Sequence, residues 1–233
     1  MKPTRTPFLR LALYSAVALG LSACGSDDDN SDNSNSGNTD AAGKAATVIL
    51  RVMETTDLHA NIMNFNYYQN AQDDTVGLVK TASLINAARA EVKNSVLVDN
   101  GDLLQGSPLG DYVAKVKGLN TNEVHPIYKA MNLLDYDVAN IGNHEFNYGL
   151  PFLKEALDDA GFPYISANVF FDDADNDSTN DIPYFKPYVL QDKQVLDSEG
   201  LAHTLTIGYI GFVPPQILQW DKNNLETRVI AKD

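Results

Sequence analysis

The sequence predicts an α/β fold, and three observations support that prediction. From Thr47 onward, short apolar runs typical of strands alternate with amphipathic segments typical of helices. Strand and helix alternating along a chain is the pattern of an α/β sheet. Three of the apolar runs are followed directly by polar clusters. In open α/β sheets, ligands bind beyond the carboxyl ends of the strands, where such clusters lie. A chain of 233 residues is long enough for a substantial core.

Apolar runs and helical spacing give the order of the elements. The predicted strands are Val48–Met53, Val96–Val98, Val138–Ile141, Tyr164–Val169 and Leu205–Val213. The clearest helix is Gly77–Val92, where apolar residues recur at helical spacing. Two further helices, Pro126–Leu134 and Pro151–Ala160, each begin with a proline, which suits the first turn of a helix. The acidic stretch Phe171–Pro183 has no such period and is predicted to be a loop.

Residues 1–24 have the layout of an export signal. A basic start is followed by the apolar run Leu11–Leu21, which is too short to span a bilayer as a stable helix. Leu21-Ser22-Ala23 before Cys24 resembles the cleavage box of bacterial lipoproteins, in which the cysteine becomes the lipidated first residue. We expect an exported protein, lipid-anchored through Cys24 to a bacterial membrane that faces the periplasm or the cell exterior. The alternative is a plain signal peptide with an incidental cysteine.

Residues 25–46 are rich in Asp, Asn and Ser and contain no aromatic or branched aliphatic residue. They are predicted to form a disordered acidic tether ahead of a domain that occupies residues 47–233. Over the whole chain 31 acidic residues oppose 17 basic ones, a net charge of -14. This charge disfavours a nucleic-acid polymer as a partner, because its phosphates would be repelled. Bound cations can neutralise a cluster of carboxylates and so allow a negatively charged substrate.

The polar clusters contain the residue types of a metal site. Asp57 and His59 follow the first predicted strand, Asp102 follows the second, and Asn143 and His144 follow the third. Strands of an open α/β sheet bring such segments together at their carboxyl ends. Asp and His two residues apart can aim an oxygen and a nitrogen at one ion, and a carboxylate can bridge two ions. Taken singly, each cluster is more typical of a helix cap.

Asp-x-His, Gly-Asp and Gly-Asn-His-Glu, in this order and at these distances, resemble the calcineurin-like metallophosphoesterases, and GNHEFNYG resembles their 5′-nucleotidase branch. The longer strings ETTDLHAN, SVLVDNGDLLQGSPLGDY and HPIYKAMNLLDYD are similar to the bacterial members of that family that act on 2′,3′-cyclic nucleotides and 3′-nucleotides. The resemblance implies a two-sheet α/β sandwich with flanking helices, of which this chain supplies about the first half.

The resemblance also implies a role for each residue of the polar clusters. Asp57 and His59 would hold the first of two divalent metal ions, Asp102 would bridge both, Asn143 would bind the second, and His144 would be the catalytic imidazole. These residue types suit manganese, zinc, cobalt and iron alike. The family takes its remaining histidine ligands from the second half of the sandwich, so we expect the 233-residue chain alone to be inactive.

The implied reaction is metal-dependent hydrolysis of 2′,3′-cyclic nucleotides to 3′-nucleotides, and then to nucleoside plus phosphate. In the commoner 5′-nucleotidase motif a carboxylate pairs with the catalytic histidine, whereas this chain has Asn147 at that position. We therefore expect His144 to lack a negative partner and to be a weaker proton carrier. A 5′-nucleotidase of the same family is one alternative, and a non-enzymatic surface lipoprotein that binds calcium is another.

The second alternative depends on the acidic stretch, where Asp173, Asp175, Asp177 and Asp181 resemble the first half of a calcium-binding loop. Ser178 replaces the central glycine of that motif and Tyr184 its closing glutamate, so a solvated loop is favoured. Of the other histidines, His125 is predicted to lie at a helix entry and His203 near the start of a strand, and neither is predicted to bind metal.

Overall fold

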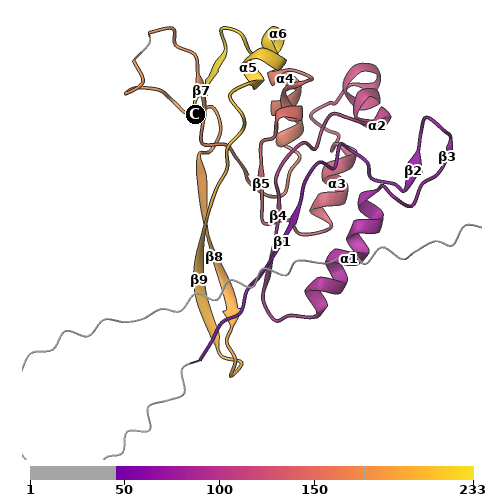
Figure 1. The fold of residues 1–233 in the computed structure, drawn as a ribbon, viewed down its shortest axis with the longest axis vertical. Coiled ribbons are helices and arrows are strands. Elements are labelled where there is room, and N and C mark those ends of the chain that lie inside the picture. Colours follow the sequence, from indigo (N-terminus) through magenta and orange to yellow (C-terminus); the bar gives the residue numbers. More distant parts are fainter. Residues whose placement is uncertain (1–45, 176) are drawn as a thin grey trace, which may run out of the picture. The chain divides into compact units, whose positions relative to one another are not determined.

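The computed structural model of the chain describes residues 46–175 and 177–233 (Figure 1). A parallel sheet is formed by β1 (Arg51–Thr55), β4 (Ser95–Asp99), β5 (Val138–Asn140) and β6 (Tyr164–Ile165), in that order. Thr55 pairs with Asp99, and Asp99 pairs with Ala139, so the strands end level with one another. The loops after β1, β4 and β5 therefore leave the sheet at the same edge.

Helices join the parallel strands. The connections contain α1 (Leu78–Ala90), α3 (Pro126–Asn132) and α4 (Leu150–Leu157). A short helix α2 (Pro108–Asp111) runs directly into the π-helix η1 (Tyr112–Lys117), and the 3-10 helix η2 (Asn143–Phe146) follows β5. Apolar side chains from α1, α3 and α4 pack with those of β4 and β5 in one core. The α/β fold predicted from the alternating pattern is confirmed.

The remaining strands pair outside the parallel sheet. A long antiparallel hairpin is formed by β8 (Tyr188–Leu196) and β9 (Ala202–Ile210). In Figure 1 this hairpin lies on one side of the parallel sheet, with α1 and α3 on the other. A second pair joins β7 (Val169–Phe171) to β10 (Val229–Ala231), and a small hairpin joins β2 (Phe65–Asn66) to β3 (Ala71–Gln72). Two short helices, α5 (Ile217–Trp220) and α6 (Lys222–Leu225), precede β10.

One predicted strand is interrupted in the structure and one observed strand was not predicted, each for a physical reason. The predicted strand Tyr164–Val169 is interrupted, because Ser166 and Ala167 donate their backbone N–H groups to Lys186 and Gly211 outside the sheet. The chain then resumes as β7 beside a different partner. The strand β8 was not predicted, because its polar residues Gln191, Asp192 and Lys193 interrupt the apolar pattern.

Both histidines outside the polar clusters lie where they were expected. His125 is fully buried at the start of α3, and its Nδ1 accepts a hydrogen bond from the backbone N–H of Ile127 at 3.2 Å. His203 lies on β9, 2.7 Å from a carboxylate oxygen of Asp197.

None of the helices within residues 46–175 and 177–233 has the length and apolar character needed to cross a membrane. The predicted export signal, the lipidation site Cys24 and all but the last residue of the predicted tether lie outside the described residues.

Candidate active site

Backbone hydrogen bonds hold the loop after β1 against the loop after β4. The N–H groups of Asp57 and His59 donate to the carbonyl oxygens of Gly101 and Asp102, each at 3.0 Å. Ala60 continues the series with a 2.7 Å bond to the carbonyl of Leu103. Two of the predicted metal ligands therefore lie directly beside a third, although more than forty residues separate them in the sequence.

The same two loops contain a cluster of left-handed backbone conformations. Asp57, His59, Ala60 and Asp102 have φ values of 54°, 47°, 52° and 59°. This region costs a residue other than glycine about 1 kcal/mol or more. Asp and His adopt it more readily than most residues, but alanine does not. Four such residues at the end of two adjacent strands show that the surrounding structure constrains the backbone, as it does at functional sites.

The loop after β5 approaches the loop after β4 at two glycines. A Cβ atom on Gly101 would overlap the backbone nitrogen of Gly142, and one on Gly142 would overlap the backbone nitrogen of Asp102. Gly101 also has a φ of 98°, which excludes most other residues. This close approach lets the N–H of His144 donate to Oδ1 of Asp102 at 2.9 Å. The three predicted clusters thus meet at one edge of the sheet.

His59 is oriented so that one ring nitrogen is available to a ligand. Its Nδ1 lies 2.6 Å from the carbonyl oxygen of Gln105. A carbonyl only accepts, so Nδ1 carries the proton and Nε2 keeps a free lone pair. Nε2 lies 3.6 Å from Oδ1 of Asp57. A backbone carbonyl that fixes a histidine in this way is the usual outer partner of a metal-binding imidazole.

His144 lies beside His59, with ring centroids 4.9 Å apart in an edge-to-face arrangement. Its Nδ1 is 2.7 Å from Oε1 of Gln105 and 2.7 Å from Oδ1 of Asn147. Both neighbours are acceptors, so Nδ1 is the protonated nitrogen in the neutral ring. The Nε2 atom of His144 is then left with a lone pair for a substrate or a proton.

The expectation that His144 lacks a negative partner holds for its direct neighbours, because both groups that face Nδ1 are amides. A carboxylate lies one side chain further away. Nδ2 of Asn147 donates to both carboxylate oxygens of Asp221, at 3.0 and 2.9 Å. Asp221 is only 7% exposed and lies between α5 and α6. The negative charge therefore lies one side chain further from the imidazole than in the motif that has a carboxylate in place of Asn147. Nothing in the local motif indicates Asp221, because 74 positions separate it from Asn147.

Glu145 holds the two loops after β4 and β5 together. Its side chain is completely buried, and its carboxylate accepts four backbone hydrogen bonds. One oxygen accepts from Leu103 at 2.5 Å and from Leu104 at 3.2 Å. The other accepts from Asp102 at 2.9 Å and from Gly142 at 2.6 Å. Sequence reasoning gave Glu145 no role, because its function depends on contacts made only after the loops converge.

Asp99, the last residue of β4, is a buried carboxyl behind the site. It accepts hydrogen bonds from the Thr55 hydroxyl at 2.5 Å and from the Gly101 N–H at 2.9 Å. Burial raises the pKa of Asp99 to about 7, although those two hydrogen bonds lower it. The negative charges of Glu145 and Asp57 raise the pKa further.

The side chains at the converging loops fit a metal ion. Asp57 offers carboxylate oxygens on a 58% exposed side chain, and His59 offers a neutral imidazole nitrogen 3.6 Å from one of them. Two ligand atoms of one first-row metal ion lie about 3 Å apart, so a small rotation of either side chain would bring both atoms to ligand distance from one ion. Asn143 begins η2 next to His144, with its side chain partly exposed. Among the described residues, no three His, Cys, Asp or Glu side chains are grouped closely enough to hold a metal by themselves.

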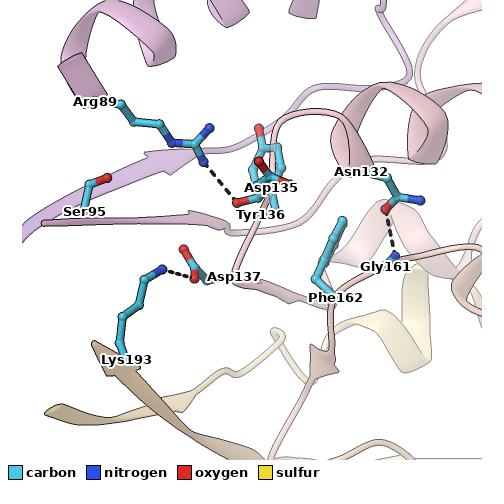
Figure 2. A pocket seen from close by; sticks show the side chains of 9 residues that line it. All are labelled: Arg89, Ser95, Asn132, Asp135, Tyr136, Asp137, Gly161, Phe162 and Lys193. Carbon is cyan, nitrogen blue, oxygen red and sulfur yellow. Dashed lines mark hydrogen bonds and ion pairs between the residues drawn. The ribbon is translucent and has the colours of Figure 1, made fainter. Parts of the chain in front are cut away.

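A cavity of about 380 Å³ lies at the opposite edge of the sheet (Figure 2). It is lined by residues before or at the start of strands, including Ser95 of β4, Asp137 before β5 and Phe162 before β6. Its two cations already have partners, since Arg89 donates to the carbonyl of Asp135 and Lys193 pairs with Asp137. None of the residues that form the candidate site lines this cavity.

Comparison with known proteins identifies the family of this chain and several relatives. The family model described as calcineurin-like phosphoesterase matches residues 50–231. The chain is 58% identical over 193 residues to the 2′,3′-cyclic-nucleotide 2′-phosphodiesterase/3′-nucleotidase of Salmonella typhimurium, covering 83% of this chain and 29% of that protein. It is 26% identical to a 5′-nucleotidase of Vibrio parahaemolyticus, covering 90% of this chain and 34% of that protein.

The crystal structure of the calcineurin-like phosphoesterase YfkN from Bacillus subtilis superposes on the chain with a TM-score of 0.74. The two are 44% identical, and the match covers 80% of this chain and 55% of that one. The chain thus spans less than a third of the length of the Salmonella relative and little more than half of the superposed structure.

Proposed function

Because the chain belongs to the calcineurin-like phosphoesterase family, we propose that the whole protein is a metal-dependent hydrolase of 2′,3′-cyclic nucleotides and 3′-nucleotides. The identity of 58% to the Salmonella enzyme of that name, against 26% to a 5′-nucleotidase, favours this activity within the family. The substrate is a nucleotide, and two divalent ions serve as cofactors. Manganese, zinc, cobalt and iron suit the ligand types equally.

One observation carries the proposal. The Gln105 carbonyl holds His59 so that Nε2 is free, with Asp57 beside it. These groups lie where the loop that contains Asp102 meets the loop that contains His144. We assign Asp57 and His59 to the first ion, Asp102 to a bridge between the ions, and Asn143 to the second. Bound ions would activate a water molecule and neutralise charge on the phosphoryl group.

His144 is assigned to the substrate. In the first reaction a water oxygen bonds to phosphorus, the bond from phosphorus to the 2′ oxygen breaks, and that oxygen takes a proton, leaving a 3′-phosphate. In the second reaction the bond to the 3′ oxygen breaks in the same way. Nε2 of His144 is the chain's own group placed to move that proton, because Nδ1 is occupied by Asn147 and Gln105.

Two substitutions in the full-length protein test these assignments. His144→Ala should lower kcat by about 100-fold or more while metal content stays unchanged, because the residue serves the substrate. Asp102→Ala should lose both metal and activity. Products are separated by chromatography and metal is measured by mass spectrometry, with His203→Ala as the control for loss of a histidine. Equal metal loss in both variants would show that the roles are divided wrongly.

The proposal extends to the location of the protein. The sequence Leu21-Ser22-Ala23-Cys24 supports lipidation at Cys24 and a site of action outside the cytoplasm, at a membrane. Cys24→Ala should move the protein from the membrane fraction to the soluble fraction, and mass analysis should find a lipid on the wild-type amino terminus only. A wild-type amino terminus without lipid would contradict the anchor.

A further inference from the structure

We propose that Asp221 is a positioning residue for His144 and acts through the side-chain amide of Asn147. The inference rests on the proposed function, since it concerns the imidazole that serves the substrate. Three side chains, those of His144, Asn147 and Asp221, are hydrogen-bonded in series. Oδ1 of Asn147 faces Nδ1 of His144 at 2.7 Å, and Nδ2 of Asn147 faces both oxygens of Asp221 at 2.9 and 3.0 Å.

The chemistry of the three groups permits only one arrangement of protons. An ionised carboxylate accepts hydrogen bonds and donates none, so the NH2 end of Asn147 must point to Asp221. The carbonyl end of the same amide must then point to His144. Because that oxygen also only accepts, Nδ1 of His144 is the nitrogen that carries the proton. Asp221 thereby determines which nitrogen of His144 faces the substrate with a free lone pair.

Asn147 alone cannot fix this choice. A side-chain amide can turn over and exchange its donor and acceptor ends at little cost in shape. In the turned orientation its NH2 group would donate to Nδ1 of His144, and the proton of the neutral ring would move to Nε2. Gln105, the other neighbour of Nδ1, is also an amide and has the same freedom. Asp221 is the only one of these partners that cannot act as a donor while ionised.

Hydrogen bonds from neighbouring groups fix the position of Asp221. Its backbone N–H donates to the carbonyl of Ile217 at 2.8 Å. Asn224, three residues later, donates to the carbonyl oxygens of Phe146 and Asn147, each at 3.1 Å. This amide fastens the segment around Asp221 to the backbone that carries Asn147. The donor Asn147 and the acceptor Asp221 are therefore both held in place by contacts of their own segments.

Asp221 is also buried without a cation. Its side chain is among the few buried acidic ones, and within the described residues no Lys, Arg or His forms an ion pair with it. Its recorded side-chain donors are the amides of Asn147 and, at 3.5 Å, Asn224. Burying a carboxylate that has only amide partners is costly, and a neutral residue would pack there more favourably. A role in orienting Asn147 explains why a carboxylate occupies the position.

The test is a set of four variants of the full-length, metal-loaded protein assayed on a 2′,3′-cyclic nucleotide. Asp221→Ala should lower kcat by about 10- to 100-fold, the usual effect of losing an outer partner. KM and metal content should change by less than about twofold, because neither the substrate nor a metal ligand is touched. Asp192→Ala, at an exposed position on β8, is the matched control and should leave kcat unchanged.

Exchanging the amide at position 147 with the carboxylate at position 221 distinguishes a positioning role of Asp221 from a role in the stability of the fold. Asn147→Asp alone places two carboxylates in contact and should lower kcat. The double variant Asn147→Asp/Asp221→Asn keeps one carboxylate and one amide in the opposite order. The introduced carboxylate then accepts directly from Nδ1 of His144, so kcat should recover to within about threefold of wild type. A double variant no more active than Asp221→Ala would overturn the proposal, as would wild-type kcat in Asp221→Ala.

A second readout does not depend on activity. Nitrogen NMR spectra of metal-free protein with labelled histidine, assigned with His144→Gln, should show the neutral wild-type ring protonated on Nδ1. The Asp221→Ala spectrum should show a mixture of both forms. If the wild-type protein fails to hydrolyse the nucleotide, the proposed function fails, and this spectrum still decides the role of Asp221. Identical ring protonation in the two proteins would refute it.

Discussion

Glu145→Gln replaces one carboxylate oxygen by an NH2 group and leaves the shape of the side chain unchanged. In the wild-type structure each oxygen accepts two backbone N–H groups, Leu103 and Leu104 on one side and Asp102 and Gly142 on the other. Whichever way the glutamine amide is turned, its NH2 end faces two N–H donors. Two buried backbone donors therefore lose their acceptor.

The expected cost follows from that count. Each buried donor without a partner costs about 1 to 3 kcal/mol, so the substitution should destabilise the two loops by about 2 to 6 kcal/mol. Because Asp102 and Gly142 lie in those loops, the metal ligands should also lose their fixed geometry. Metal affinity should fall by about 10- to 100-fold, as it does when an outer partner of a ligand is removed.

Hydrogen exchange measured by mass spectrometry in the metal-free protein reports the loop stability directly. Peptides covering residues 100–105 and 141–147 should exchange at least about 30-fold faster in Glu145→Gln, the equivalent of about 2 kcal/mol. Glu155→Gln on α4 makes the same chemical change where the side chain is partly exposed, and it should alter neither exchange nor metal binding. Unchanged exchange and metal affinity in Glu145→Gln would show that the carboxylate does not hold these loops.

Asp99, Gly106 and the metal ions supply three further predictions. In the metal-free protein Asp99 should contribute stability that is complete below pH 4 and is lost as the pH rises through about 7, because burial raises its folded pKa to about 7 from the usual value of 3.8. Asp99→Asn resembles the protonated form and should remove this pH dependence. In denaturant unfolding at pH 8 the wild-type protein should have lost about 4 kcal/mol of stability through Asp99. An unchanged pH dependence in Asp99→Asn would exclude Asp99 as its source. Gly106→Ala should weaken metal binding by about tenfold or more in calorimetry, because its Cβ would lie 2.5 Å from Nδ1 of His59 at a φ of 129°. Gly200→Ala, with a φ of 85° but open space around the Cβ, should leave metal binding unchanged, and equal losses would rule out the clash as the cause. A chelator should abolish hydrolysis and added manganese should restore it, whereas activity that survives full removal of metal would contradict a metal-dependent reaction.

The sequence predicted the parts of the fold and site that depend on local pattern and on general topology. The helix predicted at Gly77–Val92 is observed as Leu78–Ala90, because its apolar period and its glycine start are local. The convergence of Asp57, Asp102 and His144 followed from a general rule, that the carboxyl ends of parallel strands share one edge.

What the sequence could not show depends on contacts between distant residues. The run Tyr164–Val169 looks continuous, yet the chain changes partners within it, which only the positions of Lys186 and Gly211 determine. The role of Asp221 depends on two short helices that return the chain to Asn147, 74 positions away. Glu145 lies inside the motif but is oriented by backbone donors from the neighbouring loop.

Every role proposed for these residues requires that metal ions bind where the loops after β1, β4 and β5 meet. The most direct measurement is anomalous diffraction from crystals of the full-length protein grown with manganese. We expect an anomalous peak about 2.0 to 2.3 Å from Nε2 of His59 and from carboxylate oxygens of Asp57 and Asp102. Manganese found only in the acidic stretch around Asp173 and Asp175, with none at His59, would contradict it.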